Sequence, residues 1–314
     1  MSGPADTGDT RSAPVTVLGA GSWGTALAMH LARAGRPVRL WARDPALADG
    51  HTVLVAVPSH FVDAVLTGLG ERVARSAVLV SATKGLEPRH GLRMSELLAR
   101  RLPGRPVAVL SGPSFAREVA QGRPTALVIA SSDEGIAADL QRQLAGPAFR
   151  LYTNRDVVGV ELGGAVKNVM AIATGLVDGL ELGENARAAL ITRGLAEIVR
   201  LGTAAGAQPA TFAGLAGLGD LVLTCTGAQS RNRALGGQIA RGRSLADVEA
   251  GTPMVAEGVR TVSSVLRMAR ERGVTMPICE EVAAVLFEGK PVAESLASLL
   301  AREPRPEEEG VSRA

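Results

Sequence analysis

The chain has 314 residues, of which 46% are apolar and 21% are charged, so it has the composition of an ordinary globular protein and the length of two domains. Its net charge of +3 is small, and the sequence has no cluster of Lys and Arg with interleaved aromatic residues, which argues against nucleic-acid binding. The two cysteines, Cys225 and Cys279, are far apart and lack metal-ligand spacing, so we expect two reduced thiols and no metal site.

Both ends of the chain are polar. Residues 1–13 lack the apolar core of a signal peptide, and we expect them to form a disordered tail. Residues 303–314 are rich in charge, and we expect a second disordered tail there. No apolar run approaches membrane-spanning length, so the sequence predicts a cytoplasmic protein without membrane insertion.

The first half of the chain alternates short apolar runs with amphipathic stretches, and residues 61–73 and 134–144 have a helical pattern. Continuous apolar strands are expected where helices cover both faces of a sheet. The pattern therefore predicts a Rossmann-like, doubly wound α/β domain over residues 14–154. Its strands are expected at VTVL, VRLW, TVLVAV, AVLVSA, VAVL, TALVIA and FRLYT.

After Asn154 the strand signal stops, and long helical stretches rich in Ala and Gly follow. The second half is therefore predicted to be an all-α domain over residues 155–302. Its helices are expected at 156–182 and 186–205, and around 233–241, 258–272 and 280–288.

Gly19, Gly21 and Gly24 form G-x-G-x-x-G between the first predicted strand and a helical stretch. In this arrangement the first glycine allows a tight turn, the second lets the backbone approach a pyrophosphate, and the third allows close packing of helix and strand. The helix N-terminus then offers free N–H groups to the phosphates. The motif predicts dinucleotide binding, and a merely structural turn is the alternative.

The second predicted strand is followed closely by Arg43 and Asp44. An acidic residue about twenty positions beyond the glycines usually binds the ribose hydroxyls of adenosine, and Asp44 lies there. Arg43 can instead hold a 2′-phosphate. The sequence leaves NAD and NADP open, with a slight preference for NADP, and a surface ion pair is the structural alternative.

Two loops follow other predicted strands. Lys84 lies just past one strand, and Gly112, Ser114 and Ala116 lie past another. Ligands of open α/β sheets bind outside the carboxyl ends of the strands, so both loops point to one crevice. In that crevice Lys84 could orient a phosphate or a carbonyl group. The alternative is an exposed loop lysine.

Lys167 and Asn168 interrupt an otherwise apolar helical stretch, after Gly163 and Gly164, which permit close approach of another segment. A lysine in this position either extends its ammonium group to water or is buried with a lowered pKa. The buried form suits a general acid that gives up its proton near neutral pH. The residues alone leave both possibilities open.

Ser230, Arg231 and Asn232 immediately precede a predicted helix. Ser230 or Asn232 can cap that helix, and Arg231 beside the helix N-terminus makes a good phosphate anchor. Asp220 follows a glycine-rich turn and is a plausible partner for a lysine. The structural alternatives are a cap with a polar turn, and an Asx turn at Asp220.

Taken together, these segments resemble the bacterial NAD(P)-dependent glycerol-3-phosphate dehydrogenases, from about Val15 to Arg302. The resemblance is carried, in the family's order, by GAGSWGTALA, VAVPSH, SATKGLE, SGPSFA, GVELGGAVKN, ARAALITRGLAE, GLAGLGDLVLTCTG, SRNR and VAEG.

The resemblance implies reversible reduction of dihydroxyacetone phosphate to sn-glycerol 3-phosphate with NADPH or NADH, a step that feeds phospholipid synthesis, in an enzyme whose relatives are commonly dimeric. Lys167 is the implied proton donor, and Lys84 is implied to lie between cofactor and substrate. The implied substrate contacts are Lys84, Gly112, Ser114, Lys167, Asp220, Ser230, Arg231 and Asn232. The expected cofactor contacts, glycine loop included, are Gly19, Gly21, Ser22, Trp23, Gly24, Arg43, Lys84, Ala116, Arg231, Val255 and Glu257.

The chain departs from the family pattern after Asp44, because only ten residues, Ala42–His51, join the second predicted strand to the third. A parallel crossover usually takes a dozen or more residues, so about thirty residues of a typical βαβ unit are absent. Ten residues reach at most about 33–36 Å, enough for a return path of about 20–25 Å along and across the sheet.

The short connection can therefore close as a taut loop without a helix. We expect VRLW to become an edge strand and the adenine side of the cofactor pocket to be weakened. Two alternatives stay open at this point. One is a related dehydrogenase acting on another small hydroxy acid, and the other is a deletion variant that is impaired in catalysis or only binds ligand.

Overall fold

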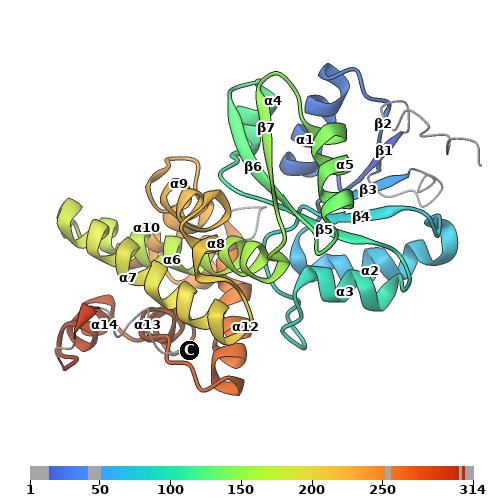
Figure 1. The fold of residues 1–314 in the computed structure, drawn as a ribbon. Helices are drawn as coiled ribbons and strands as arrows, with labels where there is room; N and C mark the ends of the chain where they lie inside the picture. The colour runs from blue at the N-terminus through green and yellow to red at the C-terminus, as the bar shows by residue number, and fades with distance from the viewer. Residues whose placement is uncertain (1–13, 42–50, 252–255, 304–305, 308–314) are drawn as a thin grey trace, which may run out of the picture.

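The computed structural model describes residues 14–41, 51–251, 256–303 and 306–307. These residues form an N-terminal α/β domain and a C-terminal helical domain that lie side by side (Figure 1). The predicted fold class, a Rossmann-like domain followed by an all-α domain, is confirmed. The predicted tail 1–13 and most of the predicted tail 303–314 lie outside the described residues.

One seven-stranded sheet, with the order β2-β1-β3-β4-β5-β6-β7, forms the centre of the α/β domain. The first five strands in this order run parallel, whereas β6 pairs antiparallel with β5 and parallel with β7. All seven strands lie at predicted positions, but the antiparallel pairing was not predicted. The strands are β1 (Val15–Leu18), β2 (Val38–Trp41), β3 (Thr52–Val55), β4 (Val78–Ser81), β5 (Val107–Ser111), β6 (Thr125–Ala130) and β7 (Phe149–Asn154).

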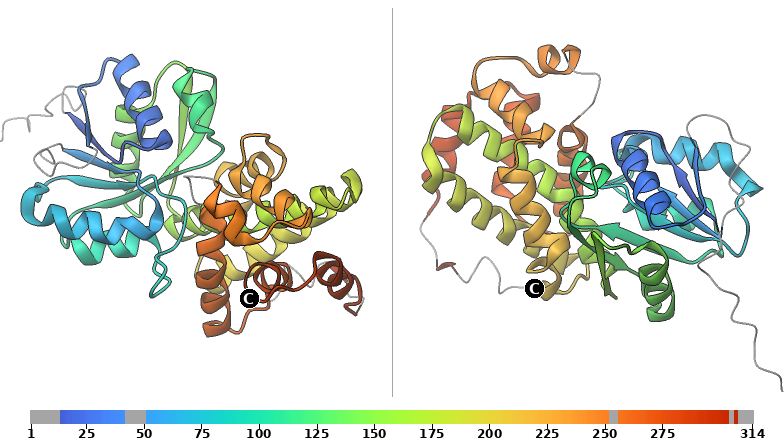
Figure 2. Two further views of the ribbon diagram at one scale, coloured as in Figure 1. Left: turned by 180° about the vertical axis from the view of Figure 1, so that it is seen from behind. Right: turned by 90° about the horizontal axis from the view of Figure 1, so that it is seen from above.

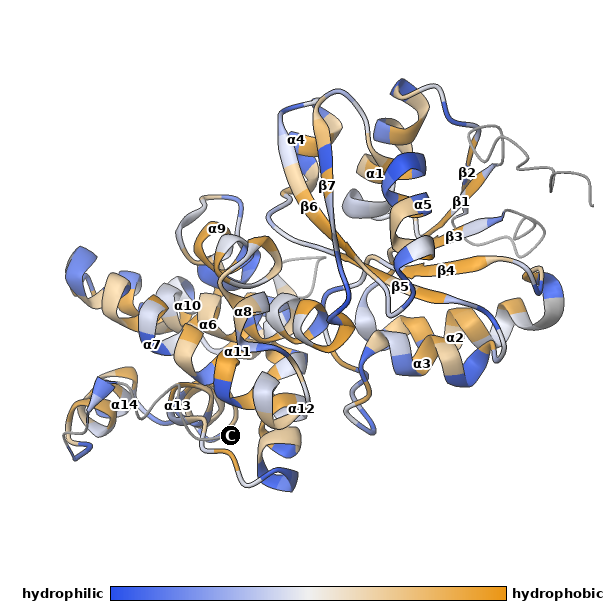
Figure 3. Ribbon diagram, viewed as in Figure 1, coloured by the Kyte–Doolittle hydropathy of each residue, from blue (hydrophilic) through white to orange (hydrophobic). Residues whose placement is uncertain are grey.

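Helices cover both faces of this sheet (Figures 1 and 2). On one face, Leu27 and Leu140 pack with the inward side chains of the strands, and on the other face Leu66 and Leu98 do so. This two-sided cover explains why most of the strands are continuous apolar runs, such as β4 and β6, which are largely orange in Figure 3. The first face carries α1 (Ser22–Arg33), α4 (Ala116–Ala120) and α5 (Glu134–Leu144), and the second carries α2 (Ser59–Leu69) and α3 (Met94–Arg101).

Strand β2 forms one edge of the sheet and, within the described part of the chain, pairs only with β1. Every residue of β1 and β3 is buried, whereas no residue of β2 is fully buried and Leu40 is 40% exposed. The expectation that VRLW becomes an edge strand is confirmed. The junction that follows it, residues 42–50, lies outside the described residues.

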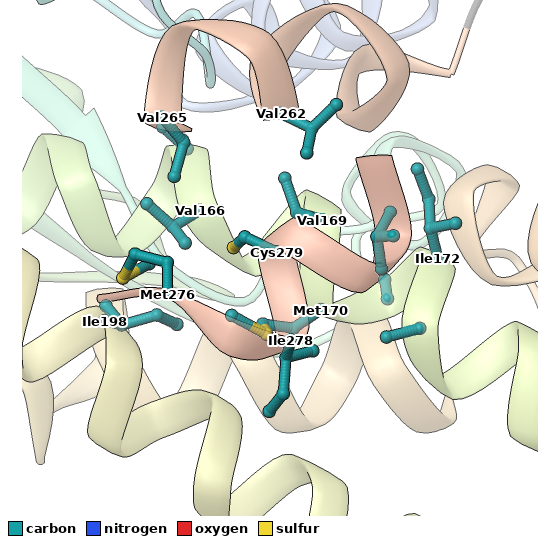
Figure 4. Close-up of a cluster of buried hydrophobic side chains, with 14 of the residues drawn as sticks. Val166, Val169, Met170, Ile172, Ile198, Val262, Val265, Met276, Ile278 and Cys279 are labelled. Atoms are coloured by element: carbon teal, nitrogen blue, oxygen red, sulfur yellow. The ribbon is translucent and has the colours of Figure 1, made fainter. Parts of the chain in front are cut away.

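The helical domain is built around α6 (Val157–Gly179), which is buried along most of its length. Figure 4 shows Val166 and Val169 of this helix facing Val262 and Val265. Cys225 and Cys279 are buried and are not joined by a disulfide. The other helical elements are α7 (Gly183–Ala204), α8 (Pro209–Phe212), a π-helical turn (Leu215–Gly219), α9 (Asp220–Thr226), α10 (Arg231–Ala240), α11 (Leu245–Ala250), α12 (Glu257–Glu271), α13 (Pro277–Phe287) and α14 (Val292–Leu300), and a 3-10 turn (Gly70–Arg72) follows α2.

Helix α6 and the segment Pro209–Thr226 are long and apolar enough to cross a membrane, so the expectation that no apolar run approaches that length is wrong. The difference arises because Glu161 and Lys167 interrupt the apolar run of α6, although the mean hydropathy of the helix stays high. In the fold, 89% of the apolar window of α6 is buried inside the domain. This burial is typical of the core helix of a soluble protein.

Helices α6 and α10 cross with their backbones in contact. A Cβ atom on Gly175 of α6 would lie 2.1 Å from the main-chain oxygen of Arg233, and one on Gly236 of α10 would lie 2.1 Å from that of Ile172. Only glycine permits such an approach. The crossing brings the beginning of α10 beside the middle of α6, where Lys167 lies.

Candidate active site

Lys84 and Asp220 meet between the two domains. Lys84 lies in the loop after β4, and its Nζ donates hydrogen bonds to Oδ2 of Asp220 at 2.6 Å and to the main-chain oxygen of Gly112 at 2.7 Å. A third bond joins it to Oγ of Ser114 at 3.2 Å. The loops after β4 and β5 and the first residue of α9 therefore converge outside the carboxyl ends of these strands, where open α/β sheets bind ligands.

Lys167 contacts the same aspartate from the opposite side. Its Nζ donates hydrogen bonds to Oδ1 of Asp220 and, at 2.8 Å, to Oγ1 of Thr224. The side chain of Asp220 is 1% exposed and that of Lys167 is 6% exposed. The sequence left open whether Lys167 reaches water or is buried, and in the structure it is buried.

The surroundings of Lys167 lower the pKa of its ammonium group to about 7. Burial is the main cause, because loss of hydration destabilises the charged form. The negative charge of Asp220 opposes this effect and raises the pKa, whereas the positive charge of Lys84 lowers it. An ammonium group with this pKa exchanges its proton near neutral pH, which is the property that a general acid and base requires.

Two glycines of α6 allow the elements of the site to approach. A Cβ atom on Gly163 would lie 2.5 Å from the main-chain oxygen of Ala216, and one on Gly164 would lie 2.6 Å from Oγ of Ser111. The π-helical turn that contains Ala216 leads directly into Asp220, and such turns occur often at functional sites. One turn of α6 thus packs on both β5 and the segment that carries the aspartate.

Thr224 is a member of the site that the sequence interpretation missed. Its hydroxyl lies one helical turn after Asp220, accepts the hydrogen bond of Lys167 and donates one to the main-chain oxygen of Asp220 at 2.6 Å. The i, i+4 spacing from Asp220 was the signal that could have identified it, since residues four apart share a helix face.

The three residues of the SRN segment, Ser230 to Asn232, have different surroundings. Ser230 caps α10, because its Oγ accepts a hydrogen bond from the main-chain N–H of Arg233 at 3.3 Å. Asn232 is buried, donates from Nδ2 to Oδ1 of Asn168 at 3.0 Å and accepts from the N–H of Gly258 at 3.0 Å. Arg231, between them, is exposed. The predicted cap is therefore present, and Arg231 is the cation that faces solvent at the beginning of α10.

The glycine loop has the geometry that a dinucleotide requires. Gly19 has a φ of +111°, and a Cβ atom on Gly24 would lie 1.8 Å from the main-chain oxygen of Gly19. A Cβ atom on Gly21 would meet no protein atom within 4 Å, so packing does not require glycine there, whereas close approach of a pyrophosphate does. Helix α1 begins at Ser22, and Trp23 donates from Nε1 to the main-chain oxygen of Ala82 at 3.0 Å.

The remaining predicted cofactor contacts lie on several segments. Glu257 begins α12 and accepts a hydrogen bond from Oγ of Ser59 in the α/β domain at 2.8 Å. Burial raises the pKa of Glu257, while the hydrogen bond from Ser59 and the charge of Arg231 lower it. Ala116 begins α4. Arg43, Asp44 and Val255 lie outside the described residues.

Comparison with protein families gives two matches that together cover most of the chain. The model for the N-terminus of NAD-dependent glycerol-3-phosphate dehydrogenase matches residues 14–51 and 45–137, and the model for its C-terminus matches residues 156–297. The N-terminal match is thus made in two parts that meet at the junction after β2.

Curated relatives match along nearly their whole length. A glycerol-3-phosphate dehydrogenase [NAD(P)+] of Geobacter metallireducens is 49% identical over 330 positions, which cover 93% of this chain and 98% of the relative. The same enzyme of Geobacter sulfurreducens is 50% identical over 92% of this chain and 97% of the relative. Both alignments therefore span nearly the whole of each relative. Since 93% of 314 residues is about 292, roughly 38 of the 330 aligned positions have no residue in this chain.

Solved structures agree. The crystal structure of a glycerol-3-phosphate dehydrogenase from Coxiella burnetii is 38% identical, has a TM-score of 0.87 and aligns over 93% of this chain and 99% of its own. A ketopantoate reductase from Ralstonia eutropha shares only the fold, with 18% identity and a TM-score of 0.59. The chain therefore belongs to the NAD-dependent glycerol-3-phosphate dehydrogenase family.

Proposed function

We propose that this protein reduces dihydroxyacetone phosphate reversibly to sn-glycerol 3-phosphate with NADPH or NADH. The observation that carries the proposal is the buried pair of Lys167 and Asp220, placed beside Lys84 outside the carboxyl ends of β4 and β5. In a member of this family, such a group provides a proton for the carbonyl oxygen next to the place expected for the nicotinamide. The product is the backbone precursor of phospholipids.

Lys167 is the proposed proton donor. When bound, the nicotinamide supplies the hydride that is transferred to the ketone carbon. Lys167 transfers its proton to the carbonyl oxygen as negative charge develops there, and the positive charge of the ammonium group stabilises that oxygen beforehand. Asp220 and Thr224 hold Nζ in place. Lys84, bound to Gly112, Ser114 and Asp220, orients the substrate from the other side.

Arg231 is the proposed anchor of the substrate phosphate, with Ser230, Asn232 and the N-terminus of α10 around it. An exposed arginine beside free N–H groups of a helix favours a dianion. Binding energy from the phosphate is remote from the reacting carbon and helps to fix its orientation.

The glycine loop is the proposed site of the cofactor pyrophosphate, with Ser22, Trp23, Ala116 and Glu257 as further contacts. Arg43 and Val255 complete the expected set, and Arg43 underlies a slight preference for NADPH. We further propose that the protein works in the cytoplasm as a homodimer without membrane insertion, which gel filtration with light scattering would test.

The proposal is tested by oxidation of NADPH in the presence of dihydroxyacetone phosphate. Turnover is expected in the unaltered protein, and Lys167→Ala is expected to lower kcat by about 10²–10⁴-fold, the usual contribution of a general acid. Lys290→Ala is the matched control, because Lys290 pairs with Glu281 at the far end of the helical domain. Circular dichroism checks folding. Retained activity in Lys167→Ala would exclude the proposed acid.

Roughly 38 positions of the alignment with the Geobacter metallireducens relative have no residue in this chain. They support a second candidate, an impaired variant that binds ligand without turnover. A folded, unaltered protein that binds NADPH and leaves dihydroxyacetone phosphate unreduced would favour it.

A further inference from the structure

Glu161 is a buried charged residue that has no role in the proposed chemistry. It lies on α6, six residues before Lys167, and its side chain is 5% exposed. Its carboxylate contacts neither Lys84 nor Lys167. A buried carboxylate is costly unless every oxygen is hydrogen-bonded, so its partners indicate why it is there.

Among the described residues, the hydrogen-bond partners of the Glu161 carboxylate belong to the other domain. Oε1 accepts a hydrogen bond from the main-chain N–H of Ser95 at 2.7 Å. Oε2 accepts from Oγ of Ser95 at 2.5 Å and from Nη1 of Arg93 at 2.8 Å. Ser95 lies in the first turn of α3, where free N–H groups and the helix dipole favour an anion. Glu161 therefore binds α6 to the N-terminus of α3.

Arg93, one of the partners of Glu161, also pairs with the loop that carries Lys84. Arg93 pairs with Leu86 in an isolated antiparallel bridge, and the N–H of Glu87 donates to the main-chain oxygen of Leu92 at 2.8 Å. Lys84 lies two residues before this bridge. These contacts hold the segment from Lys84 to Ser95 as one closed loop. Arg93 and Ser95, at the end of this segment, are the residues that contact Glu161.

Resting on the proposed function, we propose that Glu161 is a positioning residue that sets the separation of Lys84 and Lys167 and so aligns the proton donor with the substrate carbonyl. The two lysines lie on different domains and share Asp220, which belongs to a third segment. Asp220 alone can follow either lysine if the domains shift. Glu161 joins the two lysine-bearing segments directly, without passing through Asp220.

Stability alone does not account for this contact. A buried ion pair is often no more stabilising than well-packed apolar side chains of similar volume. Its specific consequence is geometric, because three directed hydrogen bonds fix both the rotation and the translation of α6 against α3. A misplacement of about 1 Å costs on the order of 10²-fold in rate when reacting groups must be aligned.

The test compares Glu161→Gln with Glu96→Gln in the full-length protein. Glu96 also binds Arg93 and caps α3, but it is 42% exposed and stays within the α/β domain. For Glu161→Gln we expect kcat to fall by about 10–100-fold with little change in KM for dihydroxyacetone phosphate. We also expect a larger kinetic isotope effect with NADPH deuterated at the transferred position. Glu96→Gln should leave kcat and the isotope effect near those of the unaltered protein.

The isotope effect separates positioning from simple destabilisation. Partial unfolding lowers kcat by removing active molecules, whereas misalignment slows the chemical step and makes the isotope effect larger. If Glu161→Gln does not fold, Ser95→Ala, which removes one donor and keeps the main-chain N–H, should show the same changes to a smaller extent. An unchanged kcat and isotope effect in the folded variant would overturn this inference alone. Absence of turnover in the unaltered protein would overturn the proposed function as well.

Discussion

Lys167 is one of only three lysines among the 34 basic residues of the chain, and Lys84 is another. Arginine keeps its charge in almost every environment, whereas burial readily lowers the pKa of a lysine ammonium group. A chain that uses arginine almost everywhere else therefore places two lysines at one buried aspartate. The sequence identified Lys167 and proposed Asp220 as the partner of a lysine. It could not show that Lys84 and Lys167 share this aspartate, since Asp220 is separated from Lys84 by 136 residues and from Lys167 by 53.

The pKa of Lys167 predicts opposite pH dependences for the two directions of the reaction. Reduction needs the protonated amine, so its rate should fall as pH rises through about 7, and oxidation of glycerol 3-phosphate should rise over the same range. In Asp220→Asn the negative charge that raises this pKa is lost, so both transitions should move to lower pH. Profiles of kcat measure this shift. The exposed Asp139→Asn serves as control, and unmoved transitions in Asp220→Asn would contradict the assignment.

The strands of the sheet were easier to predict than their directions. Seven apolar runs gave seven strands, and α5 was predicted at its observed bounds, Glu134–Leu144, because Asp133 caps it and its apolar periodicity is regular. The antiparallel direction of β6 was missed because it depends on the connection from β5, which contains only the five-residue α4. A connection that short carries no pattern from which a crossover could be distinguished.

The close crossing of α6 and α10 predicts that two neighbouring glycines of α10 differ in how much they contribute to stability. Gly236→Ala should destabilise the fold by about 1–3 kcal/mol, since the added methyl group would collide with backbone and force the helices apart. Gly237→Ala is the matched control, because its Cβ atom would lie 3.4 Å from the flexible side chain of Arg241. Urea denaturation measures both variants. Equal loss of stability in the two variants would show that the crossing is not the cause.

In the whole molecule, the active-site network among the described residues is connected despite the short junction after β2. Lys84, Lys167 and Asp220 occupy one connected network although the chain has only ten residues between β2 and β3. The network depends on β4, β5 and the helical domain, none of which borders β2. The family model for the N-terminus matches in two parts that meet at this junction. The expected weakening of the adenine side stays a prediction, because residues such as Arg43 lie outside the described ranges.

The cofactor affinity tests this separation. We expect NADPH to bind at least about tenfold more weakly than to the Geobacter metallireducens relative, equivalent to about 1.4 kcal/mol, because the edge strand β2 has less cover. Isothermal titration calorimetry on both proteins, with dihydroxyacetone phosphate titrated separately, measures the difference. Equal affinity for NADPH would show that the short junction supports the adenosine as well as the longer one.

The short junction also changes the entropy of chain closure. Val15 of β1 pairs with Thr52 of β3, a separation of 37 residues. If the unmatched positions of the Geobacter relative lie in this connection, its corresponding loop is about twice as long and costs about 0.6 kcal/mol more to close. Contacts between strands nearer in sequence also form faster. The short junction therefore makes the pairing of β1 with β3 easier to form.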